Sequence, residues 1–310
     1  MKAAQISKYG ESSVEINDVG RPEPGEGEIL VEVHAAGVNP FDWKIRDGMY
    51  EKMMPLKLPA TLGGDFSGLV AAVGANVSGF KKGDGVFGSA NVLSGGSGAF
   101  AEFAIAKTKN AALKPKKAGH TEAGAMPLTG ASALQGLVDH MKLGRGQKVL
   151  IHGGAGGIGT AAIQIAKDIG AYVAATAGEK DLEFVKSLGA DEAIDYRGQR
   201  FEKLLEGFDA VFDTVGGETY AKSFMVLKKG GVIVSMLEQP RQELMEQYGV
   251  SAIAQGTHVT GERLAKLASL IDRGVVRAHI DKAFPLAKAA EALDYQKKGH
   301  PRGKVVLEMK

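Results

Sequence analysis

A glycine-rich turn between a short apolar segment and a helical pattern constrains this sequence most. Residues 148–152 form a strand candidate, and Gly154, Gly156 and Gly159 follow it at the G-x-G-x-x-G spacing. Apolar residues then recur at helical intervals until Gly170, which supplies a left-handed stop. The pattern predicts the strand, turn and helix of a dinucleotide-binding unit. Its glycines allow a tight turn, close approach to a pyrophosphate, and close packing of helix on strand.

The backbone of this turn is expected to hold the phosphates of a dinucleotide, because a helix N-terminus attracts anions. A merely flexible loop is the alternative. The predicted contacts in the turn are Gly153, Gly154, Ala155, Gly156, Gly157 and Ile158. His152, at the end of the first strand candidate, is expected to pack beneath the turn. Gly216 follows another strand candidate, 209–213, and is expected at the same edge of the sheet.

The end of the next strand candidate indicates which dinucleotide binds. NAD-specific sites place a carboxylate about 20 residues after the glycines, and this sequence has Thr176 there. A neutral residue avoids repulsion of a 2′-phosphate, while Lys180, Tyr196 and Arg197 offer positive charge and a hydroxyl group. We therefore expect NADPH, although Glu179 lies close enough to argue for the opposite.

The hydrophobic pattern divides the chain into two domains. The first ~115 residues are typical of short strands separated by glycine and proline turns. From Thr121, helical and strand patterns alternate, which predicts a doubly wound parallel sheet. Its strand candidates are 148–152, 172–176, 192–196, 209–213, 232–236 and roughly 252–258. The segment 237–249 fits an exposed loop or a helix, and the pattern around 264–271 predicts an amphipathic helix. The last part returns to the first domain, so we expect one domain from 1–120 with 261–310, and another from 121–260.

Composition excludes several kinds of function. The chain has no cysteine, which rules out disulfides, a thiolate nucleophile and zinc sites with cysteine ligands. A formal charge of +2, from 38 basic and 36 acidic side chains, gives no strong field for nucleic acid or an anionic membrane surface. With no apolar run of the ~18 residues that a membrane helix needs, we expect a soluble, cytoplasmic protein whose partner is a small molecule.

Landmarks outside the glycine turn carry a family resemblance over nearly the whole chain. They are residues 36–42 (AGVNPFD), 62–68 (LGGDFSG), 83–86 (GDGV), 127–130 (PLTG) and 302–306 (RGKVV). On these residues the chain resembles the medium-chain dehydrogenase/reductase superfamily, and within it the quinone oxidoreductase (zeta-crystallin-like) branch. The resemblance implies an α/β protein with a GroES-like β-barrel catalytic domain, a Rossmann NADP-binding domain, an active site in the cleft between them, and a homodimer.

The resemblance also bears on metal binding. In zinc-dependent relatives a cysteine follows the first landmark and a histidine precedes the acid of the second, whereas this sequence has Asn39 and Gly64 in those regions. It implies that the site holds no metal. Without a Lewis acid to polarise an alcohol, acceptors that take hydride readily, such as quinones and enones, become more plausible substrates.

Particular residues receive roles from the resemblance. Asn39 and Tyr50 are expected to be catalytic and to line the substrate cleft, with Thr129 beside the nicotinamide. Asn39 would donate a hydrogen bond to a carbonyl oxygen that gains negative charge, or would only cap a turn; Tyr50 would deliver a proton, or only pack against a flat ring. Arg302 and Lys304 are expected near the cofactor phosphates, or are ordinary surface charges at a strand start.

Charged residues in and near the first two landmarks indicate a polar network. Asp42 and Asp65 are expected to pair with Lys44 or Arg46 in a structural role.

The sequence thus predicts NADPH-dependent reduction of quinones or α,β-unsaturated carbonyl compounds by hydride transfer without a metal. A trans-2-enoyl thioester reductase, with Tyr50 as proton donor, is one alternative. A non-catalytic NADPH-binding protein in the manner of lens crystallins is another, since fold resemblance alone does not establish activity.

Overall fold

The computed structural model describes residues 1–10 and 14–309, and the chain forms two compact units. Unit 1 comprises Met1–Ala131 and Val259–Lys310, and unit 2 comprises Ser132–His258. The first boundary falls inside helix α3 (Pro127–Leu134), later than the boundary expected after residue 120. The second lies two residues before the one expected after residue 260.

Unit 2 contains a six-stranded parallel sheet with the order β11-β10-β9-β12-β13-β14. Its strands are β9 (Lys148–Ile151), β10 (Tyr172–Ala177), β11 (Glu192–Asp195), β12 (Phe208–Asp213), β13 (Leu227–Ser235) and β14 (Ser251–Ala254). Numbered from β9, this is the 3-2-1-4-5-6 order of the doubly wound dinucleotide-binding fold. The predicted Rossmann sheet is therefore confirmed. The order reverses between β9 and β12, which is where such folds bind their ligands.

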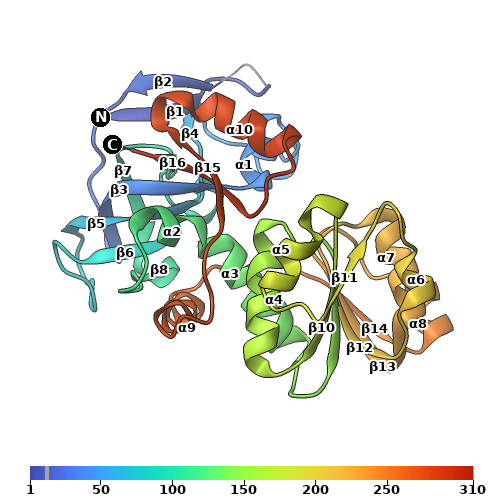
Figure 1. Ribbon diagram of the computed structural model, residues 1–310. Helices are drawn as coiled ribbons and strands as arrows, with labels where there is room; N and C mark the ends of the chain where they lie inside the picture. The colour runs from blue at the N-terminus through green and yellow to red at the C-terminus, as the bar shows by residue number, and fades with distance from the viewer. Residues whose placement is uncertain (11–13, 310) are drawn as a thin grey trace. The chain divides into compact units, whose positions relative to one another are not determined.

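Helices cover both faces of this sheet. They are α4 (Gly157–Ile169), α5 (Leu182–Ser187), α6 (Phe201–Leu204), α7 (Gly217–Ser223) and α8 (Gln242–Tyr248). Figure 1 shows α4 and α5 on one side of the sheet and α7 and α8 on the other. Val149, Leu150 and Ile151 are fully buried, as expected of a central parallel strand covered on both faces. Helix α8 occupies part of the segment 237–249, for which the sequence left loop or helix open.

Unit 1 is mainly antiparallel β-structure. One sheet has the order β15-β16-β3-β5-β6-β8, with β7 also paired to β3, and a smaller sheet has the order β2-β1-β4. Its strands are β1 (Lys2–Ile6), β2 (Val14–Asp18), β3 (Glu28–Val38), β4 (Ala60–Thr61), β5 (Asp65–Val73), β6 (Gly85–Ser89), β7 (Phe103–Lys107), β8 (Ala111–Leu113), β15 (Ile280–Pro285) and β16 (Lys304–Glu308). Strand β16 pairs antiparallel with β3, so the end of the chain completes the sheet begun by its first part.

Four more helices belong to unit 1: α1 (Pro40–Arg46), α2 (His120–Ala125), α9 (Gly261–Asp272) and α10 (Ala289–Lys298). The sequence predicted α9, whose Leu264, Leu267 and Ile271 are buried and whose cap Thr260 accepts a hydrogen bond from the Arg263 N–H. It did not predict α1 or α10. Both are short, and α1 starts at an Asn-Pro pair that also fits an isolated turn.

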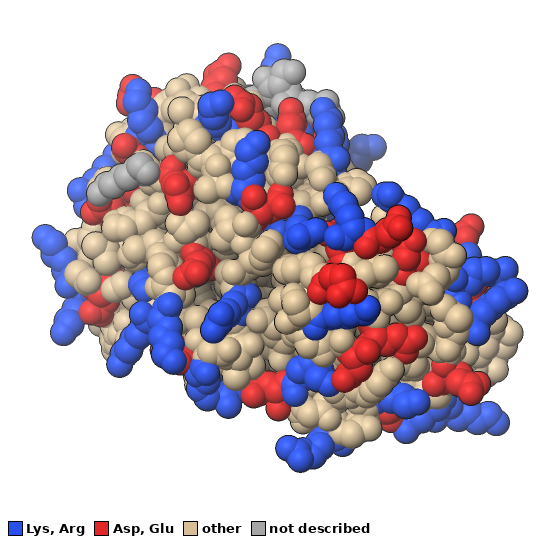
Figure 2. All heavy atoms as spheres, viewed as in Figure 1, with Lys and Arg blue, Asp and Glu red and all other residues tan. Residues whose placement is uncertain are grey.

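The surface and the helices bear on possible partners. In the view of Figure 2, basic and acidic side chains are interspersed over the face shown. Among the helices of the described residues, none has the length and apolar character needed to cross a bilayer.

Candidate active site

The glycine turn of unit 2 follows β9 and leads into α4, and its backbone is closely packed. Gly153 has a φ of 71°, which favours glycine. A Cβ on Gly159 would lie 2.2 Å from the carbonyl oxygen of Gly153. The helix therefore packs so closely on the turn that no side chain fits at this position. Gly156 is the N-cap of α4, and Gly157 and Ile158 are the first two residues of the helix. The predicted phosphate contacts thus lie together at a helix N-terminus with bare backbone, which fits a dinucleotide.

A buried hydrogen-bond chain lies beneath this turn. The Ser223 hydroxyl donates to the Thr219 carbonyl at 2.6 Å, so it accepts from Nε2–H of His152 at 2.9 Å. The other ring nitrogen, Nδ1, then accepts from the Thr176 hydroxyl at 3.0 Å. Burial lowers the pKa of His152 to about 4, which keeps the ring neutral at neutral pH. The position of His152 under the glycine turn is the one the sequence indicated.

Thr176 therefore has a different place from the one predicted. Its side chain is buried, and its hydroxyl also accepts a hydrogen bond from the Gly153 N–H at 3.3 Å. Strand β10 continues to Ala177, so the residue that follows the strand is Gly178. Thr176 supports the turn from below instead of facing a ribose. The strand candidate 172–176 ended one position before the observed end of β10 at Ala177.

Lys180, Tyr196 and Arg197 lie at the carboxyl ends of β10 and β11. These two strands pair in parallel with Ala177 opposite Asp195, so the residues that follow them are brought to the same edge. Lys180 and Arg197 are exposed, and Tyr196 is 52% exposed. The Arg197 guanidinium lies 5.3 Å from the centre of the Tyr196 ring. This edge therefore offers two cations and a phenol beside the strand that follows the glycine turn.

A second loop, after β12, lies across the switch point from the glycine turn. The buried Asp213 carboxylate accepts hydrogen bonds from the N–H groups of Val215 and Gly216 and from the Ser235 hydroxyl. The Thr214 hydroxyl donates to the His152 carbonyl at 2.7 Å, which ties the two loops together. Gly216 has a φ of 78° and is the N-cap of α7. The sequence identified Gly216 but not Asp213, whose only signal was an acid at the end of a buried strand.

In unit 1, Asn39, Asp42, Asp65 and Lys304 form a buried polar cluster. The Lys304 ammonium donates to the Val38 carbonyl at 3.1 Å and to Asn39 Oδ1. Asn39 Nδ2 donates to Asp65 Oδ2 at 3.0 Å, and the Asn39 N–H donates to Asp42 Oδ2 at 2.7 Å. None of the four residues is more than 4% exposed. Burial raises the pKa of Asp42 to about 7 and that of Asp65 to about 6, while it lowers the pKa of Lys304.

This cluster corrects three expectations. Asp42 and Asp65 do form a polar network, but with Lys304 instead of Lys44 or Arg46. Lys304 is not available at a surface for phosphate binding, because its ammonium is buried against Asn39 and a backbone carbonyl. Asn39 is the N-cap residue of α1, and both ends of its amide are used within the cluster. The Asn39 side chain is therefore 2% exposed and held within the cluster by Asp65 and Lys304.

The other predicted site residues of unit 1 are Thr129, Tyr50 and Arg302, and they are not members of the buried cluster. Thr129 is buried in the first turn of α3, next to Leu128. Tyr50 follows α1, is half-buried, and packs on Phe41 with ring centres 5.0 Å apart. Arg302 is half-buried in the turn before β16. Their expected roles stay predictions.

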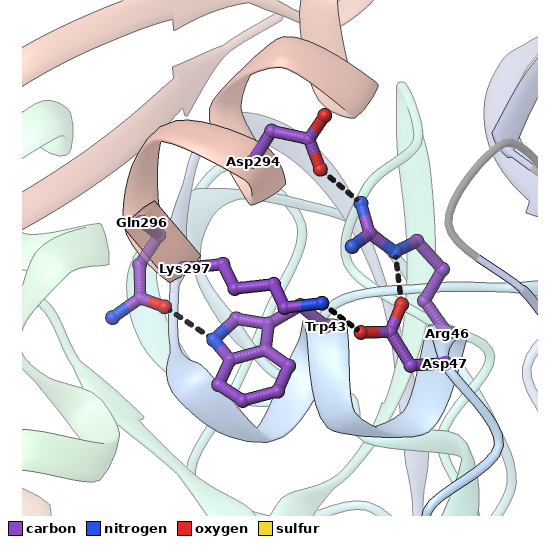
Figure 3. A network of polar contacts seen from close by, with 6 residues as sticks. All are labelled: Trp43, Arg46, Asp47, Asp294, Gln296 and Lys297. Carbon is purple, nitrogen blue, oxygen red and sulfur yellow. Dashed lines mark hydrogen bonds and ion pairs between the residues drawn. The ribbon is translucent and has the colours of Figure 1, made fainter. Parts of the chain in front are cut away.

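Arg46 belongs to a separate network between α1 and α10 (Figure 3). Its Nε donates to Asp47 and its Nη1 to Asp294, each at 2.8 Å. Lys297 donates to the same Asp47 at 2.9 Å, and the Trp43 indole donates to Gln296 at 2.6 Å. These contacts attach the helix that carries Asn39 and Asp42 to the C-terminal helix of the unit.

Comparison with known proteins decides the family. Residues 25–116 match the alcohol dehydrogenase GroES-like domain family, and residues 188–307 match the zinc-binding dehydrogenase family. A chloroplast envelope quinone oxidoreductase homolog of Arabidopsis thaliana is 34% identical over 99% of this chain and 98% of its own length. The chain belongs to the quinone oxidoreductase branch of the medium-chain dehydrogenase/reductase superfamily.

Two further relatives fit this family assignment. An NADPH-dependent alkenal/one oxidoreductase of Arabidopsis thaliana is 36% identical over 99% of this chain and 79% of its own length. The solved structure of the quinone oxidoreductase from Coxiella burnetii is similar with a TM-score of 0.92 and 34% identity, over 100% of this chain and 99% of that one. The predicted family and the two-domain α/β fold are therefore confirmed.

One of the matching families is described as zinc-binding, but the residues of this chain offer no zinc site of that kind. The chain has no cysteine, and within residues 1–10 and 14–309 no three His, Asp or Glu side chains form a metal-ligand group. At Asn39, in the region where zinc-dependent relatives have a cysteine ligand, the amide oxygen already accepts from the Lys304 ammonium. A cation beside a cation is unfavourable, so this donor set does not fit zinc.

Proposed function

We propose that this protein uses NADPH to reduce quinones and α,β-unsaturated carbonyl compounds without a metal ion. The observation that carries the proposal is the bare glycine turn at the switch point of the parallel sheet, with Lys180 and Tyr196 at the adjacent strand ends. An NADPH-dependent relative and a quinone oxidoreductase homolog, both similar over 99% of this chain, support it.

The residues of unit 2 would hold the nucleotide. The N–H groups of Gly153, Gly154 and Gly156 donate to acceptors within the protein. The pyrophosphate would lie against this bare turn and bind the N–H groups of Ala155, Gly157 and Ile158 at the start of α4. Lys180 and Arg197 would pair with a 2′-phosphate, with the Tyr196 hydroxyl beside them. The Asp213 carboxylate fixes the loop of Gly216 by accepting two of its N–H groups. When bound, NADPH supplies the hydride.

The residues of unit 1 would position and protonate the substrate. Tyr50 has a hydroxyl on a half-buried ring that packs against Phe41, and we assign it the proton that a reduced enone or quinone takes up. Thr129 would lie beside the nicotinamide. Asn39 is left out of direct catalysis, because its side chain belongs to the buried cluster. A homodimer and a cytoplasmic location stay predictions of the sequence.

The test is a steady-state assay of NADPH and NADH oxidation with quinones, enones and enoyl thioesters as acceptors. We expect turnover of quinones and enones with NADPH preferred. Turnover of enoyl thioesters alone would favour the thioester reductase, and tight NADPH binding with no acceptor consumed would contradict the proposal.

Replacing Lys180 tests the cofactor preference. A charged hydrogen bond to a phosphate contributes about 1.5–3 kcal/mol, so Lys180→Ala should lower kcat/KM for NADPH roughly 10- to 100-fold. The value for NADH should stay unchanged, because NADH lacks the 2′-phosphate. Lys186→Ala on α5, which removes an exposed ion pair with Glu183, is the matched control. Equal losses with both cofactors would remove Lys180 from the 2′-phosphate site.

A further inference from the structure

The cluster of Lys304, Asn39, Asp42 and Asp65 joins four parts of unit 1. Lys304 begins β16, Asn39 caps α1, and Asp65 begins β5. Asp65 also accepts a hydrogen bond from the Leu128 N–H in the first turn of α3, with both carboxylate oxygens 3.1 Å away. The Lys304 ammonium therefore bonds to the side chain that caps α1, and that side chain donates in turn to Asp65, which accepts from the start of α3.

The charges of the cluster make that ammonium necessary. Two carboxylates are buried in one cluster, where burial disfavours the charged form of both and the charge of Asp65 also opposes the ionisation of Asp42. Lys304 is the cationic side chain that interacts with both of them. Removing it would leave Asp42 and Asp65 to be neutralised by protons or to draw in water. Either change would disturb the hydrogen bonds at Asn39 and Leu128.

We propose that Lys304 is a positioning residue whose ammonium serves as the fixed cation of unit 1 and holds the first turns of α1 and α3 in place. It sits against Asn39, where the family resemblance expects a metal ligand in zinc-dependent relatives. The held segments carry Thr129 in α3 and lead through α1 to Tyr50. In its effect on turnover, the inference rests on the proposed function.

The experiment compares Lys304→Met, Asp65→Asn and the double variant K304M/D65N with the wild type. Methionine keeps most of the apolar stem but removes the charge, and asparagine keeps an oxygen that can accept from Leu128. We expect K304M to lower kcat at least about tenfold, since small misplacement of reacting groups has effects of this size. The KM for NADPH should change less than about twofold, because the nucleotide-binding turn is in unit 2.

Charge compensation is the outcome that separates this role from simple packing. K304M/D65N should recover at least about threefold in kcat over K304M, because removing one carboxylate removes the need for the cation. Loss of a packed stem would not be rescued in this way. Lys298→Met, at an exposed position of α10, is the matched control and should behave as wild type. Wild-type kcat in K304M, or losses that simply multiply in the double variant, would overturn the inference.

Deuterium exchange gives a readout that does not depend on turnover. K304M should exchange faster than wild type at the amides of Asn39 and Leu128, and D65N should restore part of the protection at Asn39. If the wild type oxidises NADPH with none of the acceptors, the proposed function fails while this measurement still tests Lys304. If K304M does not fold, recovery of folded protein in K304M/D65N supports the inference, and its absence overturns it.

Discussion

At the scale of single residues, His152 should make the stability of unit 2 depend on pH. Burial lowers its pKa from 6.5 to about 4, so between these values the unfolded chain binds a proton that the native state does not. The stabilisation is present above pH 6.5 and is lost as the pH falls toward 4. From pH 7 to pH 5 the loss from this residue is about 2 kcal/mol.

His152→Gln isolates this contribution. The free energy of unfolding in urea, measured at pH 7 and pH 5, should fall less on acidification in the variant than in the wild type, by about 2 kcal/mol. His140→Gln, on a half-buried histidine of the same unit, is a suitable control. The same pH dependence in the wild type and H152Q would contradict the neutral, buried imidazole described for this site.

At the scale of elements, the attachment of α1 to α10 depends on the buried Arg46. Arg46→Met removes the hydrogen-bonded ion pairs with Asp47 and Asp294, and we expect unfolding to become easier by about 2 kcal/mol. Lys297→Met should lower the free energy of unfolding by less than about 1 kcal/mol, because Lys297 is partly exposed and Asp47 would still form its ion pair with Arg46. Urea denaturation of both variants provides the comparison. Equal costs would show that the network is not centred on Arg46.

The elements also show what a sequence can and cannot predict. The parallel sheet was predictable, because its apolar strands alternate with helices and local periodicity reports both. The same local signal placed the glycine turn and His152 correctly. The contact between Lys304 and Asn39 spans 265 positions, and no local pattern reports a partner at that distance. Lys304 was therefore expected near the cofactor phosphates or as a surface charge at a strand start, and the predicted partners of Asp42 and Asp65 were the nearby Lys44 and Arg46.

At the scale of the whole molecule, the two units divide the work by their chemistry. Unit 2 offers a bare glycine turn at a helix N-terminus and exposed cations, which suit a phosphate-bearing ligand. Unit 1 buries one lysine, Lys304, against the Asn39 side chain and the Val38 carbonyl, which suits a fixed scaffold. The formal charge of +2 hides this difference, because the sum over the chain does not distinguish an exposed lysine from a buried one.

The side chains available in unit 1 predict that catalysis does not depend on zinc. The chain has no cysteine, and the Lys304 ammonium already interacts with the Asn39 amide and the two nearby carboxylates, so zinc has no suitable set of donors. We expect elemental analysis of the purified protein to find zinc far below one equivalent per chain. Turnover of the proposed acceptors should be the same before and after treatment with 1,10-phenanthroline. One equivalent of zinc, with activity lost on chelation and regained on adding the metal, would contradict both the metal-free reaction and the role given to Lys304.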